Sequence, residues 1–257
     1  MALNATEYIQ HHLKYWQWSP VGDTTSFWTF NLDTIFVSIV CGLAFFFIFL
    51  AAVRRAKIHN PSRFQVAIES IIGFVDNQVT TVLNHKDTNI ASLALSIFMW
   101  IWLMNFMDLI PVDLLPVIAS HLGVEYFRAV PTADLSLTMA LALGVFFLIF
   151  FEAIRVHSLK GFLYDVLAHP FSIYCFPANI LFRIIEEVAK PISLSLRLFG
   201  NMFAGELIFF LIALTPFWMQ WFLGWLWLGL HLFVITLQAF IFMILSIVYL
   251  GIARSSH

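Results

Sequence analysis

Residues 193–214 read SLSLRLFGNMFAGELIFFLIAL, the sequence of an apolar helix. Three polar residues nevertheless lie in its interior: Arg197, Asn201 and Glu206. Whether the charged side chain of this arginine can reach water depends on whether the helix lies in the core of a soluble protein or in a lipid bilayer. The class of protein therefore has to be established from the rest of the chain.

The composition of the chain is typical of an integral membrane protein. Of its 257 residues, 61% are hydrophobic and 11% are charged, whereas about 25% of the residues of a soluble domain are charged. Uncharged apolar runs cover residues 34–53, 90–107 and 135–151. Each can cross the hydrocarbon core as a helix, which takes about 17–25 residues. The sequence therefore predicts an all-α membrane protein with one membrane-embedded domain (1–257), and its net charge of −2 argues against nucleic-acid binding.

Basic residues predict how the chain is oriented in the membrane. Four of them directly follow the first span: Arg54, Arg55, Lys57 and Arg63. The N-terminal segment 1–33 holds one lysine and no arginine, so we expect it outside the cell, with residues 54–89 in the cytoplasm. The loop 108–134, where Arg128 is outnumbered by four acidic residues, then lies outside. Five crossings in total return the C-terminal Arg254 to the cytoplasm.

Residues 62–84 are predicted to form an amphipathic helix between the first two spans. Apolar side chains recur there at helical spacing: Phe64, Ile68, Ile71, Ile72, Val75, Val79, Val82 and Leu83. The opposite face is polar, with Gln65, Glu69, Asp76 and Thr80. A core helix of a soluble domain would show the same pattern, but the chain contains no such domain to cover it. We therefore expect an interfacial helix on the cytoplasmic leaflet.

Two long apolar segments, 177–214 and 217–253, complete the chain. The first has 38 residues and would be about 57 Å long as a helix, whereas the hydrocarbon core is about 30 Å thick. No Asp, Glu, Lys or Arg occurs from 207 to 253, so the second segment cannot extend far into water. Long helices that stay in lipid tilt, here by about 55–60° from the membrane normal. We expect about five membrane helices plus the interfacial one, the last two forming a steeply tilted hairpin that turns at 215–220.

Arg197 lies too deep in its helix for an ordinary surface residue. An arginine at the bilayer centre costs at least about 2.5 kcal/mol, so a snorkelling side chain or a structural ion pair is the alternative to a functional role. Glu206 lies about 13.5 Å further along the axis and on the opposite face, so the two cannot pair within the helix. Four residues share the face of Arg197: Ser193, Gly200, Asn201 and Ala204. Small residues let another helix approach closely, and we expect Arg197 to face a partner there.

Glu206 and His231 are the titratable groups of the long helices that can carry protons. The guanidinium of Arg197 is not deprotonated in proteins, but it favours the ionised form of a nearby carboxylate. In an antiparallel hairpin, His231 lies near the height of Glu206, and Gln238 lies about 10.5 Å further along, near Arg197. A single histidine in an apolar helix is also often a structural, hydrogen-bonded residue. An acid and a base near the outer side, with a fixed cation at mid-depth, favour a proton path that stops at a barrier.

Four segments, in matching order along the chain, resemble subunit a of the F-type ATP synthase. They read MDLIPVDLLP at 107–116, LRLFGNMFAGELI at 196–208, HLFVITLQAFIFM at 231–243 and IVYL at 247–250. The resemblance covers nearly the whole chain and is greatest for the bacterial, proton-driven type. It implies that Arg197 is the essential stator arginine, which faces the carboxylate of a ring of c subunits.

The resemblance also implies where protons travel. Positions of the two offset half-channels match Asn201, Glu206, His231 and Gln238. Asp108 and Asp113 match the region of the outer entrance, although simple solvated charges would explain them equally well. Arg183 stands where some bacterial relatives carry an acid. Glu186 and Glu187 are therefore candidates for the cytoplasmic exit, with ordinary helix-end charges as the alternative.

The resemblance further implies a location and a set of partners. The location is the bacterial inner (plasma) membrane, and the partners are the ring of c subunits, the b subunits of the peripheral stalk and the rest of the ATP synthase complex. Proton flow through this stator would drive the rotation that powers ATP synthesis in a distant soluble sector. The chain itself has no GK[ST] phosphate loop. We therefore expect a non-nucleotide-binding subunit of a proton translocase, with no cofactor and no metal ion.

Two other functions use charged groups within a membrane. A proton-coupled secondary transporter could use a buried arginine and glutamate, but the chain shows no repeated halves with paired broken helices. A haem-binding anchor subunit needs axial ligands, and His231 is the only histidine within a predicted span. The transporter is therefore the main alternative.

Overall fold

The computed structural model describes residues 16–19, 29–110, 128, 130–168 and 176–254. Most of these residues are helical, and the predicted all-α membrane fold is confirmed. In chain order the elements are β1 (Gln17–Trp18), β2 (Phe30–Asn31), α2 (Leu32–Arg54), α3 (Arg63–Leu83), α4 (Thr88–Phe106), the 3₁₀ helices η1 (Met107–Leu109) and η2 (Pro131–Ala133), α6 (Leu135–Ala168), α7 (Phe176–Ala213) and α8 (Phe217–Arg254).

Short polar side chains determine where α3 and α4 begin and end. The hydroxyl of Ser62 accepts a hydrogen bond at 3.2 Å from the backbone N–H three residues later, which caps the start of α3. Asn84 ends α3 in the left-handed conformation, with φ of 59°, a conformation that asparagine tolerates better than most residues. The carboxylate of Asp87 then accepts from the N–H groups of Asn89 and Ile90 and caps α4. These residues produce the tight turn between the two helices.

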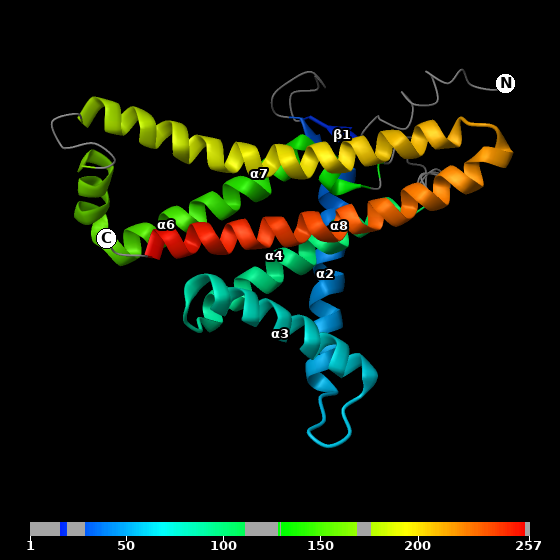
Figure 1. The fold of residues 1–257 in the computed structure, drawn as a ribbon, viewed down its shortest axis with the longest axis horizontal. Helices are drawn as coiled ribbons and strands as arrows, with labels where there is room; N and C mark the ends of the chain where they lie inside the picture. Colours follow the sequence, from blue (N-terminus) through cyan, green and yellow to red (C-terminus); the bar gives the residue numbers. More distant parts are fainter. Residues whose placement is uncertain (1–15, 20–28, 111–127, 129, 169–175, 255–257) are drawn as a thin grey trace.

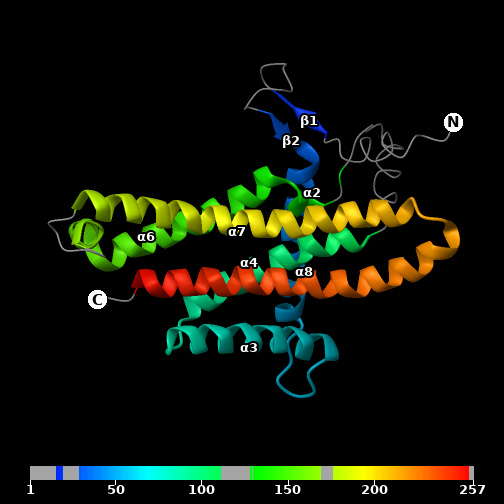
Figure 2. The ribbon, with the colours of Figure 1, turned by 45° about the horizontal axis from the view of Figure 1, so that its top comes forward.

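The long helices α7 and α8 form the predicted hairpin. Both views show them side by side, running across α2 rather than along it (Figures 1 and 2). Each has 38 residues. In these views α4 and α6 are also inclined to α2, and they pack along the hairpin, α6 against α7 and α4 against α8. The hairpin is therefore supported by two further helices that share its inclination more than that of α2.

Two apolar clusters hold the helices together. The larger one joins α2, α4, α6, α7 and α8, and its fully buried members include Met104, Leu198, Ile235 and Phe242. The smaller one joins α3, α4 and α8 and includes Val75, Val79, Ile90, Met243 and Ile247. Lipid tails are as apolar as these side chains, so close packing rather than removal from water stabilises the contacts within a bilayer. Hydrogen bonds and ion pairs therefore contribute to how the helices are positioned relative to one another.

Two features of the secondary structure go beyond what the sequence predicted. α6 continues to Ala168, far beyond the predicted end of the third span at 151, because the charged residues that end the apolar run are good helix formers. β1 and β2 form an unpredicted antiparallel pair in the N-terminal segment, with Gln17 opposite Asn31 and Trp18 opposite Phe30. Four residues are too few to produce a periodic pattern in the sequence.

α3 is a separate helix that lies beside α8, on the side away from α7 (Figure 2). By length and hydropathy alone, all six helices of the described residues could cross a membrane, α3 included. Its Val75 and Val79 are buried against α4 and α8, whereas Glu69 is exposed. Gln65, expected on the polar face, is buried, because its side-chain amide bonds to the backbone N–H and C=O of Lys57. The interfacial location of α3 remains a prediction.

Candidate functional site

The middle of α7 has one buried face and one exposed face. Leu198, Met202 and Glu206 point into the protein and are at most 3% exposed. The exposed face carries Ser193, Arg197, Gly200, Asn201 and Ala204. Arg197 and Glu206 therefore point to opposite sides of α7, in agreement with their spacing in the sequence.

Arg197 has no ion pair or hydrogen bond with any residue that the structure describes. Its surroundings on the helix are small, and a Cβ placed on Gly200 would meet no atom within 4 Å. The face around Arg197 is thus open and lined by short side chains. Such a face permits close approach by another helix.

Glu206 is held by an arginine that precedes η2. Arg128 donates from Nε to Glu206 Oε1 at 3.2 Å, and its Nη2 pairs with Oε2. The pair is buried, with 4% of Arg128 and 3% of Glu206 exposed, and its two-pronged geometry is the strong form of a charge-assisted hydrogen bond. The backbone N–H of Arg128 also donates to Asp33 at the start of α2, at 3.1 Å. The sequence reading missed this role, although an isolated arginine among four acids was a signal for an ion pair.

His231 forms a second buried pair with Asp108. Its Nε2 lies 2.6 Å from Asp108 Oδ2, so one hydrogen bond joins α8 to η1. The indole of Trp227 stacks on the imidazole at a centroid distance of 5.8 Å. Gly205 lies directly against the ring, since a Cβ placed there would be 2.2 Å from His231 Cε1. The hairpin therefore puts His231 at the height of Glu206, the neighbour of Gly205.

Asp108, Arg128, Glu206 and His231 together form what we call the buried polar cluster. Arg128 lies within electrostatic range of Asp108 as well as bonding to Glu206. Each carboxylate thus has a basic partner, which burial of a charge requires. Asp108, Glu206 and His231 can take up and release protons, whereas Arg128 cannot. Asp113, a candidate for the same region, lies outside the described residues.

Asn201 and Gln238 meet one turn along from Arg197. Asn201 Nδ2 donates to Gln238 Oε1 at 2.8 Å and joins α7 to α8. Gln238 is 2% exposed, and its Nε2 has no hydrogen-bond partner among the described residues. The side-chain Oδ1 and Nδ2 of Asn105 also have no hydrogen-bond partner among the described residues. Asn105 lies on α4, about one turn before Asp108. Because buried amides are normally hydrogen-bonded, these groups are suited to binding water.

Glu186 and Glu187 lie on α7 at the other side of Arg197 from the buried polar cluster. Lys190 Nζ is 2.9 Å from Glu186 Oε1 and 3.0 Å from Glu187 Oε1. Arg183 Nε is 3.2 Å from Glu187 Oε1, and Lys190 also lies over the ring of Tyr249 on α8, 5.7 Å from its centroid. The two acids are thus members of an ion-pair network along one helix, the arrangement typical of helix-end charges.

Comparison with known proteins decides the family. A family model described as ATP synthase A chain matches residues 34–251. The chain belongs to this family. The ATP synthase subunit a of Coxiella burnetii (strain RSA 331 / Henzerling II) is 48% identical over 258 residues, which cover 99% of this chain and 98% of the relative. The ATP synthase subunit a 1 of Methylococcus capsulatus is 48% identical over 254 residues, or 98% and 96% of the two chains.

Membership in the ATP synthase A chain family makes the chain a membrane subunit of an F-type ATP synthase. Proton transport and ATP synthesis are the processes in which this family takes part. The resemblance read from the sequence motifs is thereby confirmed, and the family match favours it over a secondary transporter. The apolar helices agree with a multi-pass protein of the bacterial plasma membrane.

Proposed function

We propose that the chain is the stator along which protons reach and leave a rotating ring of c subunits, with Arg197 facing the carboxylate of the ring. The observation that carries the proposal is the exposure of Arg197 on an open face of α7, without a partner among the described residues. A charge on an apolar helix in lipid costs at least about 2.5 kcal/mol. It therefore needs a counter-charge; none of the residues that the structure describes supplies one, and a carboxylate of a neighbouring subunit would do so.

On the outer side, protons pass through the buried polar cluster. Arg128 cannot release a proton, which leaves Asp108, Glu206 and His231 as carriers. The imidazole of His231 has two nitrogens, one bonded to Asp108 at 2.6 Å and one free to exchange a proton on the other side of the ring. Arg128 holds the Glu206 carboxylate in place by two contacts. The cluster is thus equipped to pass protons between its acids and its base.

The pair of Asn201 and Gln238 connects the interior with the open face. Asn201 is exposed beside Arg197, whereas Gln238 is buried. Amides do not titrate in the relevant range, but they donate and accept hydrogen bonds and so hold water molecules in line. The unpartnered amide atoms of Gln238 and Asn105 support such a hydrated route. Protons would reach the ring carboxylate along it.

Arg197 separates the outer path from the cytoplasmic one. Its fixed charge favours the ionised form of an approaching carboxylate, so a ring site that arrives protonated gives up its proton toward the cytoplasm. After it is neutralised from the outer side, the site can enter lipid and the ring can turn. Because Arg197 keeps its charge, protons do not pass directly between the two paths. Glu186 and Glu187 are the candidates for the exit.

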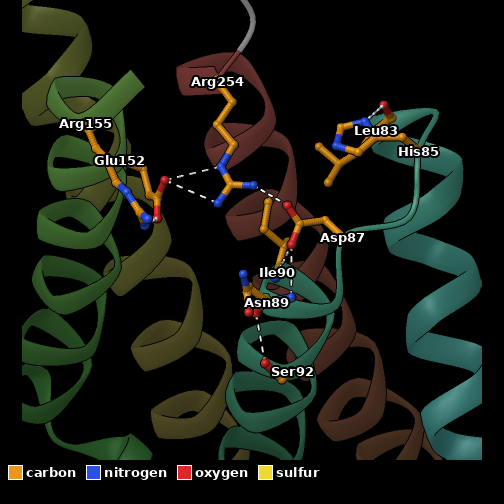
Figure 3. Close-up of polar contacts among 9 residues, drawn as sticks. All are labelled: Leu83, His85, Asp87, Asn89, Ile90, Ser92, Glu152, Arg155 and Arg254. Atoms are coloured by element: carbon orange, nitrogen blue, oxygen red, sulfur yellow. Dashed lines mark hydrogen bonds and ion pairs between the residues drawn. The ribbon is translucent and has the colours of Figure 1, made fainter. Parts of the chain in front are cut away.

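The proposed assembly places the ring of c subunits at the open face of α7, and the b subunits of the peripheral stalk hold the chain against rotation. The N-terminus is outside and the C-terminus in the cytoplasm. Support for five crossings comes from Arg254, Asp87 and Glu152, which meet at one end of the molecule (Figure 3). Their meeting requires an even number of crossings between Asp87 and Arg254, which α4, α6, α7 and α8 provide; with α2 these make the five proposed crossings.

Arg197→Ala should abolish proton-driven ATP synthesis while the complex still assembles. Without the cation, ring carboxylates pass the site still protonated, so the ring exerts no torque, and passive proton leak rises. We expect a loss of at least about a hundredfold, the scale seen when one electrostatic group is removed from a water-excluded site. Arg197→Lys should rescue poorly, because lysine lacks the planar fork and loses its proton readily when desolvated.

Assembly, proton leak and ATP synthesis should be measured in membrane vesicles from the same cells. Arg155→Ala is a matched control, since this α6 side chain is 70% exposed, and it should leave all three quantities unchanged. Normal assembly with substantial ATP synthesis in Arg197→Ala would overturn the proposal. Poor assembly of the alanine variant would instead assign Arg197 to a structural ion pair.

A further inference from the structure

The last turn of α8 is held by a charged group that the proposed proton path does not use. Arg254 pairs through Nη1 with Asp87, and its Nε and Nη2 lie 3.3 and 3.2 Å from Glu152 Oε2 (Figure 3). These side chains come from α8, from the cap of α4 and from α6. They are 24%, 16% and 19% exposed, in the order Arg254, Asp87 and Glu152. One half-buried guanidinium therefore joins three helices.

Asp87 uses its two carboxylate oxygens for different contacts. Oδ1 accepts from the N–H groups of Asn89 and Ile90, at 2.9 and 3.1 Å, and so begins α4. Oδ2 is left for Arg254. Burial acts to raise the pKa of Asp87, but the N–H of Ile90 and the Arg254 guanidinium outweigh burial and hold the pKa below its usual value. Asp87 is therefore ionised at neutral pH, and the end of α8 is held to the first turn of α4.

α8 is held a second time near the other end of α4, by its hydrogen bond from His231 to Asp108 in η1, which directly follows α4. From His231 to Arg254, α8 rises by about 34.5 Å, and from Asp87 to Asp108 the α4 segment rises by about 31.5 Å, at 1.5 Å per residue. The two lengths agree within about 3 Å, so both contacts form together in one antiparallel register. A slip of α8 by one residue would displace its side chains by about 1.5 Å and turn them by about 100°. Neither contact would survive that slip.

This register decides which side chains of α8 meet α7. It puts His231 against Gly205 and Gln238 opposite Asn201. Among the residues of α8, Arg254 is the only one of the charged types Asp, Glu, Lys and Arg. The apolar remainder of the helix gains little from one register over another, because lipid tails replace lost apolar contacts. Directional contacts therefore supply the register: those near the two ends of the segment, together with the hydrogen bond from Trp102 on α4 to Thr236 between them.

We propose that Arg254 is a positioning residue, which fixes the axial register of α8 on α4 and α6. It thereby keeps His231 and Gln238 in line with their partners on η1 and α7 while the rotor turns. This inference rests on the proposed function, because a turning ring pushes on the hairpin within the membrane plane. The planar guanidinium suits the role, since it bonds two carboxylates at once, whereas lysine offers a single point charge.

The register can be measured directly as a distance in the assembled complex. Spin labels are attached to cysteines at Ser92 on α4 and Leu226 on α8, both exposed, after the native cysteines Cys41 and Cys175 are replaced with alanine. The parent should give one narrow distance distribution. Arg254→Gln should broaden or displace it by about 1.5 Å or more, the rise of one residue.

Coupling is measured in the same preparations as protons pumped per ATP hydrolysed. Arg254→Gln should lower it at least about twofold, because small misplacements of reacting groups are costly, and Arg254→Lys should lie between. Arg155→Gln is the matched control: Arg155 lies 3.7 Å from the other oxygen of Glu152 but does not reach α8, and it is 70% exposed. It should change neither the distance nor the coupling.

Asp87→Asn provides a second route if Arg254→Gln does not assemble. Asparagine caps a helix as well as aspartate does, so this variant removes the ion pair and leaves the start of α4 intact; the same displacement is expected. An unchanged distance in these variants, or a displaced one with full coupling, would overturn the inference. The distance needs no proton transport, so it decides the register even if Arg197→Ala were to refute the proposed function.

Discussion

Glu206 and His231 are buried in apolar helices, and each has an oppositely charged or hydrogen-bonding partner from a distant part of the chain. Arg197 is exposed in the same helix as Glu206 and has no partner among the described residues. Burying a polar side chain without a partner costs free energy. For Glu206 and His231 the chain itself supplies the partners, Arg128 and Asp108. For the exposed arginine, which has no partner among the described residues, we propose a partner on another subunit.

Gly205→Ala should disrupt the contact between His231 and Asp108. The added methyl would lie 2.2 Å from His231 Cε1 and 2.9 Å from Nδ1, so the imidazole must move away from Asp108. Overpacking of this kind costs about 1–3 kcal/mol, and we expect proton pumping to fall about tenfold or more because the ring leaves its position. ATP-driven acidification of vesicles provides the measurement.

The matched control for this change is Gly144→Ala on α6, where a Cβ would meet no atom within 4 Å. Alanine favours a helix over glycine by up to about 1 kcal/mol, so this variant should assemble and pump like the parent. Equal pumping by Gly205→Ala and the parent would show that the position of the His231 ring does not matter for transport.

At the scale of elements, α8 is a nearly uncharged helix whose position depends on its neighbours. α4 contacts it over most of its second half, through Met243 and Ile247 in the smaller apolar cluster and through Trp102, whose indole N–H donates to Thr236 Oγ1 at 3.2 Å. α3 reaches the same end, since a Cβ on Gly251 would lie 2.7 Å from Leu83 Cδ2. The end of α3, the start of α4 and the end of α8 thus lie together around Asp87.

Acid should weaken the contact between α4 and α8, because protonation of Asp87 removes its ion pair with Arg254. The pKa of Asp87 in the folded protein lies below the usual value of 3.8, so the folded state binds fewer protons than the unfolded state. The stabilisation is therefore fully present above about pH 4 and is lost as the pH falls through the lower folded pKa. For a pair of this exposure we expect about 1 kcal/mol or less.

The measurement compares the apparent melting temperature of the parent with that of Asp87→Asn in detergent. The parent should be the more stable protein at about pH 7 and at about pH 5, and the difference should shrink as the pH falls below about 4 and through the lowered pKa of Asp87. Asparagine keeps the cap of α4, so the difference reports on the charge alone. A difference that does not depend on pH would contradict this account.

At the scale of the whole molecule, the hairpin runs across α2 (Figures 1 and 2), and two of its polar groups bind it to other elements. The buried polar cluster joins α7 and α8 to η1 and Arg128. The group around Arg254 joins α8 to α4 and α6 about 34.5 Å further along the helix. The proposed outer path lies at the first of these groups, whereas the group around Arg254 lies outside the proposed paths and joins the helices.

Side-specific labelling tests the orientation of the molecule. Cysteines at Leu207 and Leu232, the neighbours of Glu206 and His231, should react with a membrane-impermeant thiol reagent or silver ion applied from the outer side. A cysteine at Asn89, exposed at the start of α4, should react from the cytoplasmic side and serves as the control. Labelling of the first two positions from the cytoplasm alone would refute the orientation and the water access proposed for them.

The helices themselves were predictable from the sequence, because each depends on local properties. Apolar run length, helical periodicity and charge placement led to the long hairpin, the amphipathic segment and the opposite faces of Arg197 and Glu206. The continuation of α6 to Ala168 was not predictable in this way, since hydropathy marks where lipid ends and not where a helix ends.

Only the tertiary structure decided which polar residues are partners. Arg128 and Glu206 are 78 residues apart in the sequence, Asp108 and His231 are 123 apart, and Asp87 and Arg254 are 167 apart. No periodicity connects positions at such separations; the contacts arise from the crossing of helices and from the register of α8 on α4. The identity of the polar residues was visible in the sequence, whereas their pairing depends on how the apolar helices pack.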